Sequence, residues 1–165
     1  MVQLAWLVYD DEGEEIAAQS HIIRPEGFKI PKSAERIHGI STDMALEEGV
    51  SLEKVMAKFS HICGRQKIIV GHNLPFDKGT ILAESQRLNM PLNLPQEEIC
   101  TMRSRQVVNY CQLPCRGGRR FKWPKLSELH YSLFREEFEA AHDALKDATV
   151  CAKCFFKLKE MGVIE

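Results

Sequence analysis

The chain has 165 residues, of which 44% are hydrophobic and 27% are charged, and its formal net charge is −1. This size and composition predict one globular domain over residues 1–165 and exclude a disordered or low-complexity protein. No apolar run approaches the length of a membrane span and no secretory signal follows Met1, so we expect a cytoplasmic protein without a membrane partner.

The first segment is predicted to form a β-hairpin. Residues 2–9 are almost continuously apolar and rich in strand-forming side chains, which favours a strand covered on both faces. The Asp-Asp-Glu-Gly sequence at 10–13 is a turn signal, and residues 15–23 then return as the second strand.

Two helices follow the hairpin. The first is short, spans 33–37 and ends at Gly39. The second begins at Ser51 and stops at Gly64, and its apolar side chains recur at helical spacing: Leu52, Val55, Met56, Phe59 and Ile62.

The remaining chain alternates short apolar runs with helical patterns, which favours an α/β fold. In chain order we predict a strand at 67–71, a helix at 76–88, a strand at 98–102, a helix at 103–111, a loop at 112–122, a helix after Pro124 and a last helix at 141–159. The 67–71 strand is expected to be buried.

The charge is unevenly distributed along the chain. Residues 101–125 contain seven basic residues and no acidic residue, which favours contact with a polyanion. The stretch 116–125 mixes cations with two aromatic residues, as surfaces that bind single-stranded nucleic acid do; a solvated loop held by Trp123 is the alternative. The candidate contacts are Arg116, Arg119, Arg120 and Lys122.

The six cysteines are expected to be reduced thiols, because no secretory signal is recognised. The close pairs at 111/115 and 151/154 resemble zinc-ligand spacing. The second pair lies within the predicted last helix, where a tight zinc knuckle is disfavoured.

Two short motifs carry the candidate chemistry. His-Asn-Leu-Pro-Phe-Asp at 72–77 and His-Asp-Ala-Leu-Lys-Asp at 142–147 each place a carboxylate, Asp77 or Asp147, at the opening of a predicted helix. Carboxylates bind hard divalent cations, and His142 can accept a proton from a metal-bound water. The pair indicates metal-dependent phosphodiester hydrolysis. For each carboxylate taken alone, a role at the helix start is the simpler interpretation.

These motifs resemble the second and third motifs of the DEDDh (DnaQ-like) 3′–5′ exonucleases, a family that includes the epsilon proofreading subunit of bacterial replicative DNA polymerase, ribonuclease T and oligoribonuclease. Residues 37–41 are similar to the family's "hGIT" turn, and residues 125–127 to its "kL" helix start. The resemblance covers nearly the whole chain in the right order. It implies a ribonuclease H-like fold, in which a mixed five-stranded sheet is flanked by helices.

The resemblance also implies the chemistry. The family removes nucleotides from the 3′ end of single-stranded DNA or RNA and uses two Mg²⁺ or Mn²⁺ ions. Carried over by position, Asp77 and Asp147 would be metal ligands and His142 the general base. Asn73 would contact the substrate, and Phe76 is expected in the core.

The sequence departs from the family at its first motif, an Asp-x-Glu at the end of the central first strand. The acidic residues at 10–15 do not replace this motif, because a hairpin turn should lie at the opposite end of the strands from the metals. Relative to the family, we therefore expect an N-terminally truncated domain without its first strand, at most weak ion binding and impaired turnover.

Three explanations of this departure stay open: a gene product that starts earlier, a truncated form of the protein, or neighbouring strands that close the gap with help from a partner strand or a homodimer. We favour an upstream segment that lies outside this sequence. Two functions other than catalysis are also possible: a non-catalytic nucleic-acid-binding module with an exonuclease-like fold, and a protein-interaction domain that recruits a strand.

Overall fold

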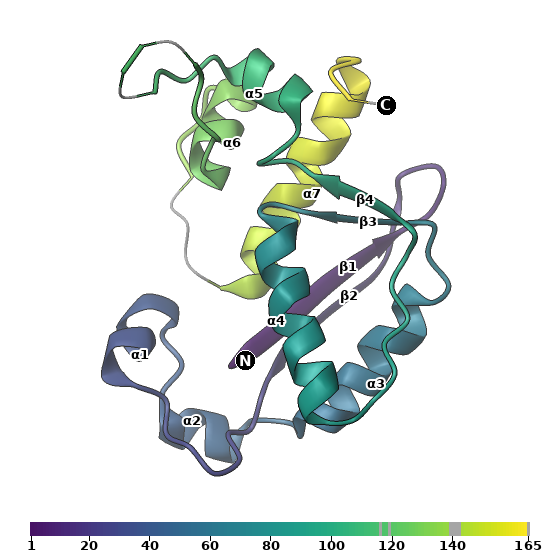
Figure 1. The fold of residues 1–165 in the computed structure, drawn as a ribbon, viewed down its shortest axis with the longest axis vertical. Helices are drawn as coiled ribbons and strands as arrows, with labels where there is room; N and C mark the ends of the chain where they lie inside the picture. The colour runs from purple at the N-terminus through teal and green to yellow at the C-terminus, as the bar shows by residue number, and fades with distance from the viewer. Residues whose placement is uncertain (116, 119, 139–142, 165) are drawn as a thin grey trace.

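The computed structural model describes residues 1–115, 117–118, 120–138 and 143–164. Within these ranges the chain alternates strands with helices, which confirms the predicted α/β class (Figure 1). The elements are β1 (Gln3–Tyr9), β2 (Glu15–Ile22), α1 (Lys32–His38), α2 (Thr42–Glu47), α3 (Leu52–Cys63), β3 (Ile68–Gly71), α4 (Leu74–Arg87), β4 (Glu97–Cys100), α5 (Arg105–Cys111), α6 (Leu126–Phe134) and α7 (Ala144–Glu160).

The predicted hairpin is confirmed. Strands β1 and β2 pair antiparallel, from Gln3 opposite Ile22 to the far end of the hairpin, where the register shifts between Val8 and Tyr9. The carboxylate of Asp10 accepts hydrogen bonds from two backbone N–H groups of the turn, which supplies partners that the strands do not.

A second, parallel pair is formed by β3 and β4, in register from Ile68 opposite Glu97 to Gly71 opposite Cys100. Among the described residues, no backbone hydrogen bond joins this pair to the hairpin, so the strands form two small sheets.

The two sheets share one core, and the β3–β4 sheet also contributes to a second. Leu4, Trp6 and Val8 of β1 lie in a cluster with the apolar face of α3, and Ile69 of β3 packs against that cluster. Val70, the next residue of β3, packs instead into the cluster built from α6 and α7. Successive residues of β3 therefore face different cores, which is the alternation expected of a strand covered on both sides.

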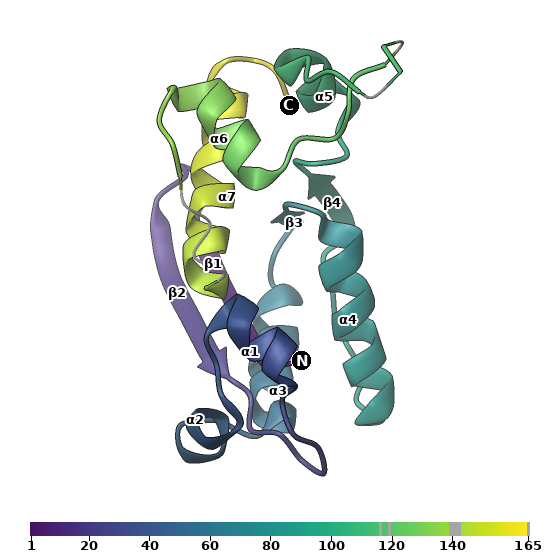
Figure 2. The same ribbon diagram turned by 90° about the vertical axis from the view of Figure 1, so that its left-hand side faces the viewer.

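The helices position the ends of β3. Helix α7 packs along β1 and β3, and Figure 2 shows β3 between α7 and α4. Helix α3 confirms its prediction from the Ser51 cap to Gly64. Helix α2 was not predicted, although the Ser41 hydroxyl accepts the backbone N–H of Met44 and so provides an ordinary N-cap.

Two sequence predictions about burial are wrong. Phe76, expected in the core, is 68% exposed, and Ile68, in a strand expected to be buried, is 36% exposed. Trp123, which the alternative interpretation of its loop took as an anchor, is 55% exposed. Periodicity assigns the face on which a side chain lies but does not show whether another element covers that face.

In the part of the chain that the structure describes, no helix is long and apolar enough to cross a membrane. The hairpin turn packs against Phe156, because a Cβ at Gly13 would lie 3.2 Å from its ring. Phe156 is nine residues after Asp147, or ~14 Å along α7. The acidic turn is therefore remote from the start of α7, as predicted.

Candidate active site

Asp77 lies in the first turn of α4, directly after β3. The chain leaves β3 at Gly71 and turns through Asn73, which has a left-handed backbone with φ of 70° and does not cap the helix with its side chain. Asn73 tolerates this conformation better than most residues because its short amide can bond locally. The turn aims the first residues of α4 at the carboxyl end of the parallel strands.

Burial raises the pKa of the Asp77 carboxyl to about 6, and this effect outweighs the hydrogen bond from its own backbone. The residue as a whole is nonetheless exposed, so solvent screens part of this effect. Its carboxylate is thus partly desolvated and only weakly compensated. Carboxylates in such a setting bind a proton or a cation more readily than fully solvated ones do.

Asp147 lies in the first turn of α7 and is half-buried. The helix begins with Asp143, whose carboxylate accepts the backbone N–H of Lys146 at 2.9 Å and the side-chain amide of Gln3 at 3.1 Å. The Lys146 hydrogen bond lowers the pKa of Asp143. Asp143 is therefore the helix cap of α7, and the link to Gln3 fixes the start of α7 on β1.

Helix α7 brings Asp147 toward the end of β3. Cys151, one turn after Asp147, is buried; burial raises its pKa to about 12, and the nearby charge of Asp77 adds to the rise. The hydroxyl of Thr101 lies 3.8 Å from the Cys151 sulfur and donates to the Gly71 carbonyl. The first turns of α4 and α7 are therefore neighbours across the end of β3.

His72 is a structural residue that joins two segments of the chain. Its Nε2 donates to the Pro124 carbonyl at 3.0 Å, and its Nδ1 contacts the Thr101 hydroxyl at 2.9 Å. Burial lowers its pKa, so the ring is neutral at physiological pH. The histidine joins the end of β3 to the segment before α6.

Three of the predicted substrate contacts lie within the described residues, and their surroundings differ. The side-chain carbonyl of Asn73 accepts a hydrogen bond from Arg103 at 3.2 Å. Arg120 is exposed, and the Lys122 ammonium is paired with Glu128. The remaining candidates, His142, Arg116 and Arg119, lie outside the described residues.

Arg103 was not predicted as a site residue. It follows β4, and the carboxyl ends of neighbouring parallel strands meet at one edge of a sheet, so its place after the strand was the available signal. Its guanidinium lies 4.9 Å from the centre of the Trp123 ring.

Two carboxylates are too few oxygen ligands for a site that holds two divalent cations. Asp77 and Asp147 supply oxygen ligands of the kind that Mg²⁺ and Mn²⁺ prefer, and a cation would offset the desolvated charge of Asp77. Among the described residues, no group of three or more His, Cys, Asp or Glu side chains is close enough to hold a metal ion. The described cysteines, all free, likewise form no zinc cluster.

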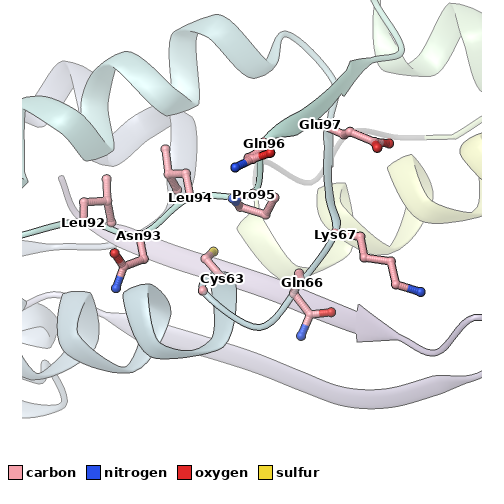
Figure 3. Close-up of a pocket in the computed structure, with 10 residues that line it drawn as sticks. Cys63, Gln66, Lys67, Leu92, Asn93, Leu94, Pro95, Gln96 and Glu97 are labelled. Atoms are coloured by element: carbon pink, nitrogen blue, oxygen red, sulfur yellow. The ribbon is translucent and has the colours of Figure 1, made fainter.

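A cavity of about 630 Å³ lies elsewhere, between the end of α3 and the segment before β4 (Figure 3). Cys63, Lys67 and Glu97 are among its lining residues, so it opens at the amino end of β3 and β4. None of the predicted site residues lines it. Burial raises the pKa of Cys63 to about 11, which leaves its thiol protonated and unreactive.

The family model described as Exonuclease (RNase_T) matches residues 1–155. The chain therefore belongs to this exonuclease family, and its two motifs are of the DEDDh type. It is a nuclease-family protein, and exonucleases of this kind generally use divalent metal ions.

Among solved structures, the chain is similar to Exonuclease I of E. coli in complex with a dA16 oligonucleotide, with a TM-score of 0.76 and 18% sequence identity. The similarity covers 96% of this chain and 36% of that chain, so this chain spans about a third of that nuclease's length. It establishes the ribonuclease H-like fold. A search of curated proteins gave no match.

Proposed function

We propose that this chain is the catalytic core of a 3′–5′ exonuclease that acts on single-stranded nucleic acid. The observation that carries the proposal is the placement of Asp77 and Asp147 in the first turns of two helices that meet across the end of β3. The oligonucleotide in the Exonuclease I structure supports a single-stranded DNA substrate.

In this proposal Asp77 and Asp147 hold the divalent cation, which would stabilise charge on the phosphate and favour ionisation of the attacking water. His142 accepts a proton from that water as its oxygen bonds to phosphorus. The bond from phosphorus to the 3′ oxygen of the remaining strand breaks, and that oxygen takes up a proton. Asn73 and the basic segment hold the strand in place.

Full activity needs more carboxylates than these two. The family's Asp-x-Glu motif would supply them from a strand that runs between β1 and β3, next to the carboxyl end of β3. We expect this chain by itself to show little or no turnover. A longer form that carries such a strand upstream of Val2 should be active.

The experiment incubates both forms with 5′-labelled single-stranded DNA and RNA in Mg²⁺, Mn²⁺ or EDTA. The expected result is a ladder that shortens from the 3′ end only with the longer form and a divalent ion. The substitution Asp147→Asn should abolish the ladder. The matched control is Asp11→Asn, which changes an acid at the remote turn, where Asp11 pairs with Lys67. A longer form that is inert on both substrates would refute the proposal.

The open edges of β1 and β3 support a related proposal, that a further strand completes the sheet. The longer form, a second copy and another protein are the three sources of such a strand, and backbone pairing is common to all three. Amide hydrogen exchange tests this: the β1 amides that do not pair with β2 should exchange quickly in the 165-residue chain and slowly in the completed one. Fast exchange in every form and partner state would contradict it.

A second candidate function is a nucleic-acid-binding module without catalysis. The basic segment 101–125 favours it, because seven cations without an acid attract phosphates. It predicts salt-sensitive oligonucleotide binding with no hydrolysis in any form. Binding that is unchanged after Arg116, Arg119 and Arg120 are replaced by Gln would count against this function.

A further inference from the structure

Trp123 differs sharply from the other tryptophan of the chain. Trp123 is 55% exposed, whereas Trp6 is 8% exposed and lies in the core. Exposure alone indicates no function, since single apolar side chains are common on surfaces. Two features of its surroundings, a fixed backbone and a neighbouring cation, indicate that the exposed ring is available to a ligand.

The backbone on the carboxyl side of Trp123 is held in place. Pro124 is fully buried, and its carbonyl accepts the hydrogen bond from His72. The backbone N–H of Lys125 donates to the Glu128 carboxylate at 2.8 Å. Trp123 is therefore presented to solvent from a fixed segment, so little conformational entropy remains to be lost when the ring contacts a ligand.

Arg103 connects this indole to the candidate active site. Its guanidinium lies over the Trp123 ring at 4.9 Å and donates to the Asn73 side-chain carbonyl at 3.2 Å. Asn73 lies one helical turn before Asp77. Since Arg103 covers one face of the indole, the exposed surface of Trp123 lies on the rest of the ring.

Resting on the proposed function, we infer that Trp123 stacks on an unpaired base of the strand whose 3′ end lies at Asp77 and Asp147. Arg103 contacts a phosphate beside that base, because a guanidinium stacked on a ring keeps N–H groups at its edge for phosphate oxygens. The excess of basic residues in 101–125 matches a polyanionic strand.

This contact selects single strands over duplexes. A base in a duplex is already stacked and paired, and its faces are not available to an indole without unstacking. Phosphate contacts do not discriminate in this way. The opposing interpretation is a purely structural Arg103–Trp123 pair, in which loss of the ring changes thermal stability and leaves nucleic-acid binding unchanged.

The experiment measures the affinity of the 165-residue chain for fluorescein-labelled oligo(dT), and for a blunt DNA hairpin, by anisotropy in EDTA. Trp123→Ala should weaken oligo(dT) binding by about 5- to 150-fold and leave hairpin binding unchanged. Trp123→Phe should retain most of the affinity. The matched control is Phe28→Ala, at a residue that is 48% exposed in the loop between β2 and α1.

Tryptophan fluorescence gives a second signal. Oligo(dT) should quench the exposed Trp123, and the quenching should disappear in Trp123→Phe, where buried Trp6 still reports the folded state. Oligo(dT) affinity that is unchanged in Trp123→Ala, or lost equally for the hairpin, would overturn the inference.

These failures are distinct from failure of the proposed function. If Trp123→Ala binds normally while the longer form cuts from the 3′ end and Asp147→Asn does not, only the stacking role is wrong. If the parent chain binds no oligonucleotide and the longer form is inert, both are wrong.

Discussion

Helices α4 and α7 both begin beside the candidate active site, but they begin in different ways. Helix α7 starts with Asp143, whose carboxylate accepts a backbone N–H at 2.9 Å and whose pKa is lowered. Helix α4 starts with Asn73, whose side chain does not cap the helix, and has Asp77 in its first turn with a pKa raised to about 6. The two aspartates share a residue type and a position near a helix start.

The difference teaches how to separate a structural carboxylate from a functional one. Helix N-termini favour negative charge, so position alone predicts stabilisation for both aspartates. Asp143 gains that stabilisation through the hydrogen bonds that it accepts from Lys146 and Gln3. At Asp77 partial burial raises the pKa instead, and perturbed carboxylates of this kind are more frequent at functional sites.

The largest expected difference is in catalysis. Asp77→Asn in the longer form should lower metal-dependent hydrolysis by at least ~100-fold, because a ligand carboxylate is lost. Asp143→Asn should keep activity within a few fold, since Asn also caps helices. Initial rates on labelled single-stranded DNA measure both changes. Equal losses of activity would contradict the distinction between a functional Asp77 and a structural Asp143.

The next effect is on folding stability, where the Asp143 substitution should cost more than the Asp77 substitution. Asp143→Ala should lower the free energy of unfolding by about 1–2 kcal/mol, because it removes the N-cap of α7. Asp77→Ala should not lower it in metal-free buffer. Urea denaturation measures the two changes. A larger loss at Asp77 than at Asp143 would show that Asp77 is the structural residue.

A smaller effect is expected at Asn73, where the backbone φ is 70°. Asn73→Ala should cost about 1 kcal/mol, because an alanine is strained in the left-handed region, whereas Asn73→Gly should be close to neutral. Both variants lose the bond to Arg103, so their difference in urea denaturation isolates the backbone term. Equal stabilities would mean that the turn relaxes.

The smallest effect is a pH dependence. The folded-state pKa of Asp77, about 6, is above its ordinary value of 3.8. The stability linked to this group is thus fully present below pH ~4 and is lost as pH rises through about 6. In EDTA, Asp77→Asn should therefore raise the melting temperature by a few degrees at pH 7.5, with a gain that shrinks toward pH 4. A pH-independent gain would contradict this.

Helix-capping and helix-terminating residues predicted several elements well. Ser51 and Gly64 bracket α3 where helical spacing was expected, and Gly39 ends α1 in the left-handed conformation. These signals depend on a few neighbouring residues, which is why the sequence is sufficient. Helix α2 was not predicted although Ser41 caps it, because a helix of six residues is too short to show a clear apolar periodicity.

Exposure was predicted poorly where it depends on distant segments. Phe76 follows buried Leu74 by two residues on α4, yet it is exposed because none of the described elements covers that side. Trp123 is similar, since its flanks are fixed by His72 and Glu128 while the ring stays outside. Neither outcome is encoded by the residues adjacent in sequence.

The sequence alone determined the two aspartate motifs, their order and the helix starts that carry them, because each of these depends on residue type and short spacing. The tertiary structure decided that Asp143 caps its helix while burial raises the pKa of Asp77, and that Arg103 joins Trp123 to Asn73. It also decided that β1 and β3 share one core without a backbone hydrogen bond between them among the described residues. Those outcomes depend on which segments meet in space, and contacts between residues far apart in the chain arise only when the whole domain packs.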